Sequence, residues 1–389
     1  MCKKTITSEY VSYGHPDKIA DQISDAILDA YLKEDKNCRT GIETMVKDNI
    51  VVLGGEVNSN TTVNYDNIVR GVFNALPFGE EHHLSPSDIK VVNLIGKQSS
   101  EIHSGVDKDN GVIGAGDQGF MCAMASNETD VFMPLGHYLA KKICQYVASL
   151  TPLYGPDTKT QVTVEYDEYN KASVKYILVS TMHQNSLHNC RNDIAKYIRH
   201  NKINLPKDIF DKYIKNNKDL TIAVNPCGEW RTGGPVSDCG VTGRKIVVDA
   251  FGGYCNVGGG AYSGKDQTKV DRSAAYMCRY LAKNIVASGI CNTAKVELSY
   301  IIGEPKPCAI NIEMDTNNVY VPKIIEWIKL NVNLTPQGIM ELFDSSYPRY
   351  YNTARYGHYG YNVDDSKELE KLYPWEKTDI AEDIKLYLK

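Results

Sequence analysis

The sequence predicts an α+β protein in which helices cover β-sheets. Two observations carry this prediction. Short runs rich in β-branched and aromatic residues recur at 50–53, 90–94, 161–165, 175–179, 246–248 and 295–302. Amphipathic helical patterns separate these runs, so sheets and helices have to pack on one another to bury their apolar faces. At 389 residues the chain is long enough for two or three domains.

Composition and charge argue against several classes of protein. The formal net charge is −5 without a long basic block, so we expect no nucleic-acid partner. No apolar run is long enough to span a bilayer, and residues 1–4 lead into polar residues rather than a signal segment, so we expect no membrane partner and a cytoplasmic location. The eleven cysteines include no C-x-x-C pair and are expected to be reduced thiols.

The first expected helix begins at Gly-His-Pro-Asp-Lys, residues 14–18. Pro16 suits the first helical position. Apolar residues then follow at helical spacing: Ile19, Ile23, Ile27 and Tyr31. His15 and Asp17 therefore lie at a helix start, where a capping residue and an acid that matches the helix dipole are the commoner roles. Action on a ligand is the alternative.

A second motif is Gly-Ala-Gly-Asp-Gln-Gly at 114–119. Its small residues allow the backbone to approach a ligand closely while Asp117 and Gln118 face it. The alternative is a type II turn with polar side chains at its tip.

The most informative run is Gly-Gly-Gly-Ala-Tyr-Ser-Gly-Lys-Asp at 258–266. From Gly259 it satisfies G-x-x-x-x-G-K, but Asp266 stands where a phosphate loop has the Ser or Thr that binds Mg²⁺. Consecutive glycines still let backbone N–H groups turn toward an anion, and Lys265 adds a positive charge. The run therefore indicates an anion loop of another kind, with a solvated glycine turn as the alternative.

The residues after this loop predict a helix over about 268–287. Apolar groups repeat at Val270, Ala274, Met277, Leu281 and Ile285, and the pattern stops near Gly289. Lys265 and Lys269 then lie at the N-terminal end, where the helix dipole disfavours cations unless a polyanion binds. Asp271, one turn into the helix, is either an ordinary first-turn acid or a ligand for a metal that bridges to phosphate.

Together these motifs resemble the S-adenosylmethionine synthetase (methionine adenosyltransferase) family. The hexapeptide GAGDQG is identical to that of the family, and the nonapeptide GGGAFSGKD differs only at Tyr262. Further matches follow in the family order over nearly the whole chain, at 8–12, 14–22, 55–56, 95–99, 127–130, 238–245, 269–276, 356–360 and 374–377. Several long motifs in one order are far more specific than any one of them.

The resemblance implies a reaction between ATP and L-methionine. The methionine sulfur displaces tripolyphosphate from C5′ of ATP to give S-adenosylmethionine, and the tripolyphosphate is then cleaved to pyrophosphate and phosphate. The family's ATP-binding positions correspond to His15, Asp157, Lys159, Trp230, Asp238, Arg244, Lys245, Ala261 and Lys265. Five of these are expected to be catalytic because they stabilise charge on the leaving group: His15, Lys159, Arg244, Lys245 and Lys265.

The resemblance also implies a methionine pocket and metal ions. The pocket positions correspond to Glu56, Gln98, Asp117, Asp238 and Lys269, where carboxylates suit the ammonium group and a lysine suits the carboxylate. Two Mg²⁺ ions per site are expected with Asp17 and Asp271 as ligands, and one K⁺ at Glu43. Arg244 and Lys245 precede the expected strand at 246–248, so they can serve one site only if a loop holds them there.

One segment departs from the family pattern. Where the family has Gly-Arg-Phe-Val-Ile-Gly-Gly-Pro, residues 228–235 read Gly-Glu-Trp-Arg-Thr-Gly-Gly-Pro. Trp230 keeps an aromatic face for adenine stacking. Glu229 reverses one charge, and Arg231 can partly restore it.

The family has three similar α+β domains around a pseudo-threefold axis, with each sheet covered by helices on one face. Here they are expected at 1–100, 114–232 and 233–389, with a mobile active-site loop and linker at 101–113. The family implies a homodimer or a dimer of dimers with active sites between two subunits. Two other functions stay open: an ATP or tripolyphosphate hydrolase that lost methionine use, and a non-catalytic regulatory paralogue. The intact methionine positions argue against the first, and the intact phosphate and metal positions argue against the second.

Overall fold

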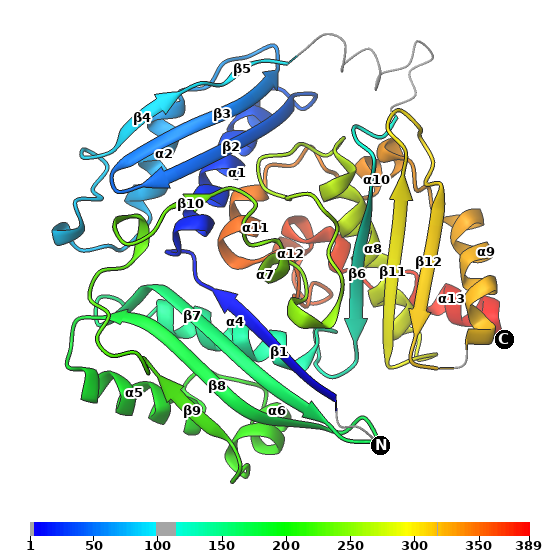
Figure 1. Cartoon of the computed structure of the whole chain (residues 1–389). Coiled ribbons are helices and arrows are strands. Elements are labelled where there is room, and N and C mark those ends of the chain that lie inside the picture. The colour runs from blue at the N-terminus through cyan, green and yellow to red at the C-terminus, as the bar shows by residue number, and fades with distance from the viewer. Residues whose placement is uncertain (1–3, 99–113, 317) are drawn as a thin grey trace.

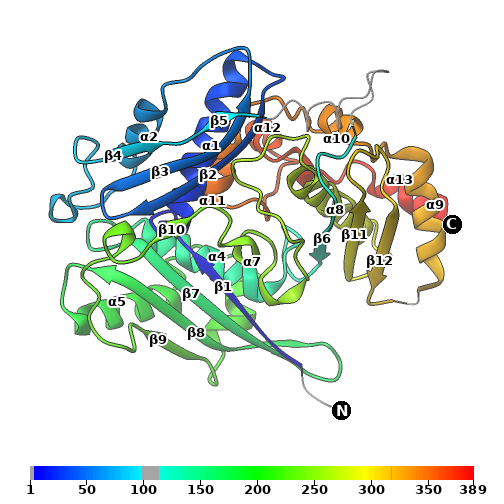
Figure 2. The same ribbon diagram turned by 45° about the horizontal axis from the view of Figure 1, so that its top comes forward.

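The computed structural model describes residues 4–98, 114–316 and 318–389. Within these ranges the strands form three sheets, and each sheet has a long helix on the side that faces the middle of the molecule (Figures 1 and 2). Each sheet with its helices is one α+β unit, so the predicted fold class is confirmed. The active-site loop expected at 101–113 lies outside the described residues.

The first sheet has the strand order β10-β2-β3-β4, with β5 also paired to β3. Its strands are β2 (Arg39–Lys47), β3 (Ile50–Asn58), β4 (Lys90–Asn93), β5 (Gly96–Lys97) and β10 (Gly240–Val241). The helices α1 (Pro16–Glu34) and α2 (Tyr65–Asn74) pack together, α1 against β2 and α2 against β4. The apolar stripe predicted for α1 is buried at Ile19, Ile23, Ile27 and Tyr31, which confirms the pattern.

The second sheet has the order β1-β7-β8-β9. Its strands are β1 (Lys4–Val11), β7 (Tyr154–Tyr166), β8 (Ala172–His183) and β9 (Thr221–Val224). The helix α4 (Leu135–Ala148) packs on β7 and β1, α5 (Leu187–Arg199) packs on β9, and α6 (Lys207–Phe210) follows α5 in the chain. Asp157 and Lys159 lie on β7, where Lys159 is in register with Val11 of β1.

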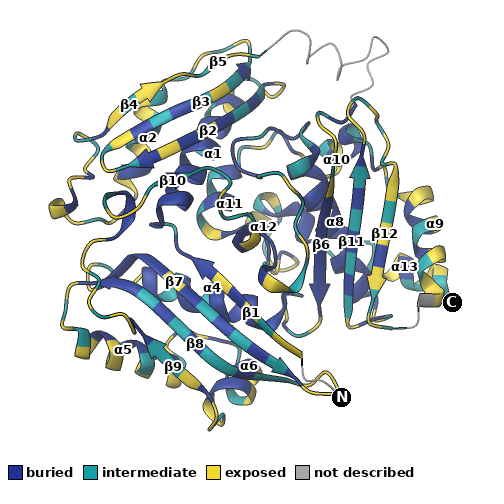
Figure 3. Cartoon of the chain, in the orientation of Figure 1, coloured by how far each residue is buried: buried dark blue, intermediate teal, exposed yellow. Residues whose placement is uncertain are grey.

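The third sheet has the order β12-β11-β6. Its strands are β6 (Gly119–Ser126), β11 (Thr293–Tyr300) and β12 (Ala309–Met314). The helix α8 (Val270–Ala287) packs on β6 and β11, and the five apolar residues predicted for it are fully buried. The outer helices of this unit are α9 (Val321–Asn331), α10 (Pro336–Leu342) and α13 (Ala381–Leu388). Figure 3 places the buried residues along the sheets and α8, and exposed ones on α5 and α9.

Each sheet contains one strand from a neighbouring part of the sequence. The first sheet receives β10, the second receives β1 and the third receives β6. The three units are thereby linked in a cycle around a centre that holds α7 (Ile246–Asp249), α11 (Tyr350–Tyr356) and α12 (Lys367–Leu372) (Figure 1). The three strands β10, β1 and β6 join sheets on the other side of the expected domain boundaries at 100, 114 and 233. These boundaries therefore remain a prediction.

The expected strand at 246–248 is wrong, because these residues form the single helical turn α7. The Asp249 N–H donates to Lys245 O at 2.8 Å, and the Asp249 carboxylate accepts from Lys18 Nζ at 2.6 Å. A run of three β-branched residues has a weak strand preference, and this buried ion pair to α1 outweighs it. Arg244 and Lys245 therefore precede a helical turn rather than a strand.

Within the described ranges, no helix is both long and apolar enough to cross a membrane. The cysteines of the same ranges are all free thiols, as the sequence predicts.

Candidate active site

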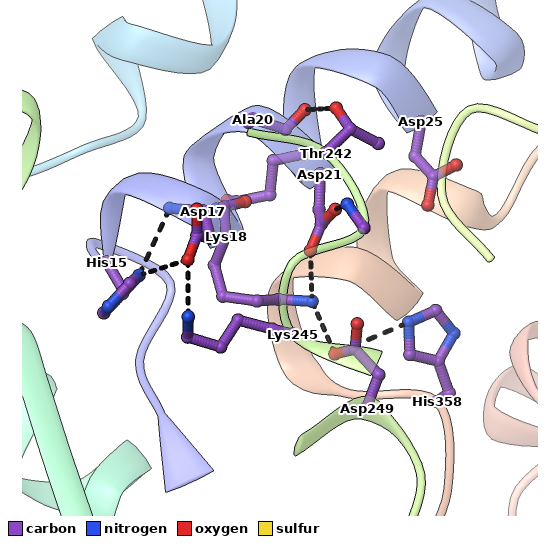
Figure 4. A network of polar contacts seen from close by, with 12 residues as sticks. His15, Asp17, Lys18, Ala20, Asp21, Asp25, Thr242, Lys245, Asp249 and His358 are labelled. Atoms are coloured by element: carbon purple, nitrogen blue, oxygen red, sulfur yellow. Dashed lines mark hydrogen bonds and ion pairs between the residues drawn. The ribbon is translucent and has the colours of Figure 1, made fainter. Parts of the chain in front are cut away.

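The start of α1 brings His15 and Asp17 together with Lys245 (Figure 4), and Arg244 also lies near Asp17. His15 caps the helix, and its Nδ1 accepts a hydrogen bond from the Asp17 N–H at 3.2 Å. Asp17 Oδ2 lies 2.5 Å from Lys245 Nζ, and Asp17 Oδ1 lies 3.9 Å from Arg244 Nη1. The capping and ligand-binding interpretations of His15 are therefore compatible, because capping uses only one ring nitrogen.

The hydrogen bond at Nδ1 fixes the protonation of the His15 ring. Burial, together with the positive charges of Lys245 and Lys159, lowers the pKa of His15 to about 3. The imidazole is therefore neutral at physiological pH. Because Nδ1 accepts from a backbone N–H, the single ring proton is on Nε2, which can donate to an oxygen of a ligand.

Asp157 adds a buried carboxylate beside this helix start. Its Oδ2 accepts from the Gly234 N–H at 2.8 Å, whereas Oδ1 is buried without a hydrogen-bond partner among the described residues. Burial raises the pKa of Asp157 to about 6, although Gly234 and Lys159 favour the ionised form. A buried acceptor without a partner is costly, so Oδ1 points to a donor supplied by a ligand.

Trp230 lies over the same end of β7. Lys159 Nζ is 6.0 Å from the centre of its indole ring, and Asp238 contributes to the electrostatic surroundings of His15 and Asp157. We call this group the His15 cluster, and its members are His15, Asp17, Asp157, Lys159, Trp230, Asp238, Arg244 and Lys245. The structure thus brings together seven of the nine predicted ATP positions, and Asp17 with them.

A buried ion network supports the His15 cluster from behind (Figure 4). Lys18 Nζ lies 3.0 Å from Asp21 and 2.6 Å from Asp249, and Asp249 lies 3.9 Å from His358 Nε2. Burial disfavours the charged ammonium, but the two acids outweigh it and raise the pKa of Lys18. The network ties α1 to α7, which carries Lys245 at its N-terminal end. Sequence patterns did not predict it, because Lys18 and Asp249 are 231 residues apart.

The glycine loop at 258–266 and the start of α8 form a second charged group. Lys265 Nζ lies 2.5 Å from Asp271 Oδ2, and Lys269 pairs with Asp266. Gly260 approaches so closely that a Cβ there would lie 2.1 Å from the Asp271 carboxyl carbon. Gly264 has a φ of +83°, and its N–H donates to Asp25. The glycines therefore serve close packing around the acids as well as backbone freedom.

Asp266 anchors this loop through hydrogen bonds to its carboxylate. The Ser or Thr at this position of a phosphate loop would instead bind a metal through its hydroxyl. Its carboxylate accepts from the Thr40 N–H at 2.7 Å and from the Thr268 N–H and hydroxyl at 3.0 and 2.6 Å. Burial opposes its ionisation, but Lys269 and Arg39 outweigh burial and lower the pKa of Asp266. The two lysines near the start of α8 are thus supported by acids, so a bound polyanion is not needed to explain their position.

Asp117 lies near the start of α8 too. The Gly116 N–H donates to Thr268 O at 3.3 Å, and β6 begins at Gly119, just after Asp117. We call this second group the Asp271 cluster: Asp117, Ala261, Lys265, Asp266, Lys269 and Asp271. In the described part of the chain, no hydrogen bond or ion pair joins it to the His15 cluster.

The other predicted site residues lie on the first sheet. Glu56 on β3 is in register with Gly41 of β2 and Gly96 of β5, and Gln98 follows β5, where its N–H donates to Val57 O at 3.1 Å. Gly41 also forms a bridge with Lys265, which places this edge next to the Asp271 cluster. Glu43 lies exposed on β2. Within one chain the five residues predicted to bind methionine thus lie in three places. Glu56 and Gln98 lie at the first sheet, Asp117 and Lys269 belong to the Asp271 cluster, and Asp238 belongs to the His15 cluster.

Comparison with known proteins identifies the family. Three family models match consecutive parts of the chain: the N-terminal domain of S-adenosylmethionine synthetase at 3–100, its central domain at 112–230 and its C-terminal domain at 232–377. The S-adenosylmethionine synthase of Mycoplasma mycoides is 39% identical over 100% of this chain and 98% of its own length. That of Nitratiruptor is 41% identical over 98% of both.

A solved structure agrees with these sequence matches. The chain is similar to an S-adenosylmethionine synthetase described as unusual, from Campylobacter jejuni, with a TM-score of 0.87 and 38% identity over 99% of this chain and 100% of the other. The resemblance inferred from the motifs is thereby confirmed. The chain belongs to the S-adenosylmethionine synthetase family, whose members are methionine adenosyltransferases.

Proposed function

We propose that this protein makes S-adenosylmethionine from ATP and L-methionine by attack of the sulfur on C5′ of ATP, and then cleaves tripolyphosphate to pyrophosphate and phosphate. One observation carries the proposal within the family assignment. Each of two clusters holds one acid next to one lysine, Asp17 with Lys245 and Asp271 with Lys265, both at 2.5 Å. Paired acids and lysines suit a long polyphosphate that brings metal ions with it.

The adenosyl transfer needs a good leaving group. A thioether has no proton to lose, so the sulfur attacks without a general base. Negative charge grows on the oxygen that leaves C5′, and the neutral His15 ring can donate its Nε2 proton in a hydrogen bond to that oxygen. Fixed donors of this kind lower the barrier because they need little reorganisation in the transition state.

Four cationic residues are proposed to hold the tripolyphosphate: Lys159, Arg244, Lys245 and Lys265. Lys245 and Lys265 are hydrogen-bonded to acids in the free chain, so each can turn its ammonium toward a phosphate oxygen only when another cation takes its place at the acid. Removal of one such group typically costs about a hundredfold or more in rate.

Asp17 and Asp271 are the proposed Mg²⁺ ligands, and their surroundings fit this role. Each carboxylate already stabilises a cation, the paired lysine. Within the described ranges no three or more His, Cys, Asp or Glu side chains are placed to hold a metal ion together, so phosphate oxygens and water would complete the coordination shell, as is usual for Mg²⁺. When bound, two Mg²⁺ ions would neutralise charge on the leaving tripolyphosphate. A role of Glu43 in K⁺ binding is proposed from the family resemblance alone.

The nucleoside is proposed to bind at the second sheet. Trp230 offers an aromatic face to the adenine, and Asp157 Oδ1 offers a buried acceptor to a hydroxyl donor. Asp238 in the same cluster is proposed to contact both substrates, and Ala261 of the glycine loop to line the ATP site. The methionine pocket is proposed to consist of Glu56, Gln98, Asp117, Asp238 and Lys269.

We propose that two copies of the chain complete each active site, in a homodimer or a dimer of dimers. Among the described residues no hydrogen bond or ion pair joins the His15 and Asp271 clusters of one chain, so the His15 cluster of one subunit can face the Asp271 cluster of its partner. Large apolar side chains exposed on the first and third sheets are available for such contact, among them Val92, Leu94 and Phe120. Free thiols suit the reducing cytoplasm, where we expect the protein to act.

The test is to incubate the protein with ATP, methionine, Mg²⁺ and K⁺ and to quantify S-adenosylmethionine, pyrophosphate and phosphate together by chromatography. Equal yields of the three products would support the proposal. Phosphate without the sulfonium product would favour the hydrolase, and bound ATP without turnover would favour the regulatory paralogue. Omission of Mg²⁺, and replacement of K⁺ by Na⁺, test the two metal assignments separately.

A further inference from the structure

Arg231, which has no equivalent in the family pattern, holds the loop that follows β8. Its Nη1 donates to the carbonyl oxygens of His183, Gln184 and Asn185 at 3.1, 2.6 and 2.7 Å. Its Nη2 and Nε donate to the Glu229 carboxylate at 3.1 and 3.4 Å. Four of the five N–H groups of the guanidinium can be used in these contacts, so the side chain is engaged within the chain rather than directed at a phosphate.

His183 makes a second connection between the same two segments. Its N–H donates to Trp230 O at 3.0 Å, and its Nε2 accepts from the Trp230 N–H at 3.4 Å. Its Nδ1 lies 2.8 Å from Asn185 O. Because a carbonyl only accepts and a backbone N–H only donates, the ring is the neutral tautomer with its proton on Nδ1. The backbone of Trp230 is therefore fixed on both sides, by His183 and by the neighbouring Arg231.

The indole ring of Trp230 is fixed too. Its Nε1–H donates to Thr232 O at 2.6 Å, so the ring has no free hydrogen-bonding group and can offer a ligand only its faces. Lys159 Nζ lies 6.0 Å from the ring centre. Just beyond Thr232, Gly233 packs against Asp157: a Cβ at Gly233 would lie 3.0 Å from the Asp157 Cβ. An aromatic face, an ammonium and an acceptor without a partner thus lie side by side.

We propose that Arg231 and Glu229 are positioning residues that hold Trp230 ready to stack on the nucleobase of ATP. This inference rests on the proposed function, because it assigns the nucleotide subsite of the same reaction. It replaces the expectation that Arg231 restores the charge lost at Glu229 by direct contact with the nucleotide. The family arginine and valine at these two positions are replaced here by an ion pair that acts on the tryptophan between its two members.

The positioning role can be separated from a role in stability. The side chains of Arg231 and Glu229 are 41% and 55% exposed, and an ion pair this exposed adds little to folding. Arg231→Met should therefore leave the thermal unfolding temperature nearly unchanged. Arg199 is a matched control, because it also holds loop carbonyls of this unit, Leu220 O at 2.8 Å and Asn217 O at 3.4 Å, but does not contact the 229–232 segment.

The first experiment compares the kinetics of Arg231→Met, Trp230→Ala, the double variant and Arg199→Met. Trp230→Ala should raise the KM for ATP by roughly five- to a hundredfold, the usual range for loss of one stacked base. Arg231→Met should raise it by a smaller factor, while the KM for methionine and kcat change less than twofold. The double variant should match Trp230→Ala, because Arg231 acts through the tryptophan. If the two effects on the KM for ATP multiply in the double variant, or if Arg231→Met leaves this KM unchanged, the proposal is overturned.

The second experiment follows nucleotide binding directly. Trp327 and Trp375 are buried, so quenching of tryptophan fluorescence by MgATP without methionine reports on Trp230. Arg231→Met should need at least fivefold more ATP for half-maximal quenching, Arg231→Lys should partly recover the wild-type value, and Arg199→Met should retain it. Equal quenching curves for wild type and Arg231→Met would overturn the inference even if S-adenosylmethionine is made. Quenching as expected, without that product, would instead contradict the proposed function.

Discussion

Lys245 Nζ lies 2.5 Å from Asp17 Oδ2, and the Asp17 side chain is only 2% exposed. Lys265 and Asp271 repeat the same pairing in the second cluster. Both acids are the proposed Mg²⁺ ligands, and in the free chain each is paired with a lysine. The free chain therefore holds both carboxylates in an ordered position before substrate arrives, which lowers the cost of assembling the site.

His15→Asn should slow adenosyl transfer about a hundredfold or more, because it removes the Nε2–H donor near the C5′ oxygen. Hydrolysis of added tripolyphosphate should fall much less, since that step breaks a bond farther from the ring. Rates of both reactions, measured separately, check this prediction. His188→Asn on the exposed surface of α5 is the control. Equal losses in the two reactions would refute the role given to His15.

Asp157 predicts a pH dependence of ATP use. Its pKa is raised to about 6, so the carboxylate is ionised above that pH and loses acceptor strength below it. The kcat/KM for ATP should fall as the pH drops through 6 in the wild type, whereas Asp157→Asn should be slower at pH 8 and lack this step. Dividing the wild-type pH profile of kcat/KM by that of Asp157→Asn removes the contribution from the titration of ATP itself. A constant ratio from pH 5 to 8 would contradict the assignment.

The buried pair of Asp25 and Arg272 predicts a large effect on stability. Both side chains are 0% exposed, and the guanidinium contacts both carboxylate oxygens, at 2.7 and 2.8 Å. Asp25→Asn should lower the free energy of unfolding by about 3–5 kcal/mol, because it leaves Arg272 charged and buried without its carboxylate partner.

Urea denaturation measures this effect. The exposed pair of Asp66 and Arg70 provides the control, since Asp66→Asn should lower the free energy of unfolding far less. The result would also show how firmly the glycine loop is held, because Asp25 accepts from the Gly264 N–H. A loss at Asp25 no larger than that at Asp66 would contradict the account.

The sequence alone predicted the elements with long, regular patterns. The helices α1 and α8 begin within two residues of where Pro16 and the lysines near Asp271 indicate. Their apolar spacing extends over four to five turns, which makes the pattern specific. The three-residue run at 246–248 offered no such length, and a distant lysine decided its conformation.

Contacts between distant segments could not be predicted in this way. In the sequence, Asp266 marks only a departure from a phosphate loop. In the structure it supports Lys269 and the loop itself. The ion network around Lys18 and the contacts of Arg231 with the loop after β8 also join segments far apart in sequence, and no local pattern signals them. The motif resemblance predicted the candidate site residues, but their division into two clusters required the structure.

In the proposed function, the His15 cluster of one chain and the Asp271 cluster of a second chain act on one substrate. The most direct measurement uses Asp17→Asn and Asp271→Asn chains with different tags, expressed together and purified through both tags. Each variant alone should be inactive. The mixed dimer should regain roughly half of the wild-type activity, since one of its two sites would have both acids.

A mixed dimer of Asp17→Asn with Lys245→Met is the matched control and should stay inactive, because both changes lie in the His15 cluster. Recovery in the first mixed dimer without recovery in the second is the predicted result. If the Asp17→Asn and Asp271→Asn dimer is as inactive as its parents, the active site is not shared between two chains and the account is wrong.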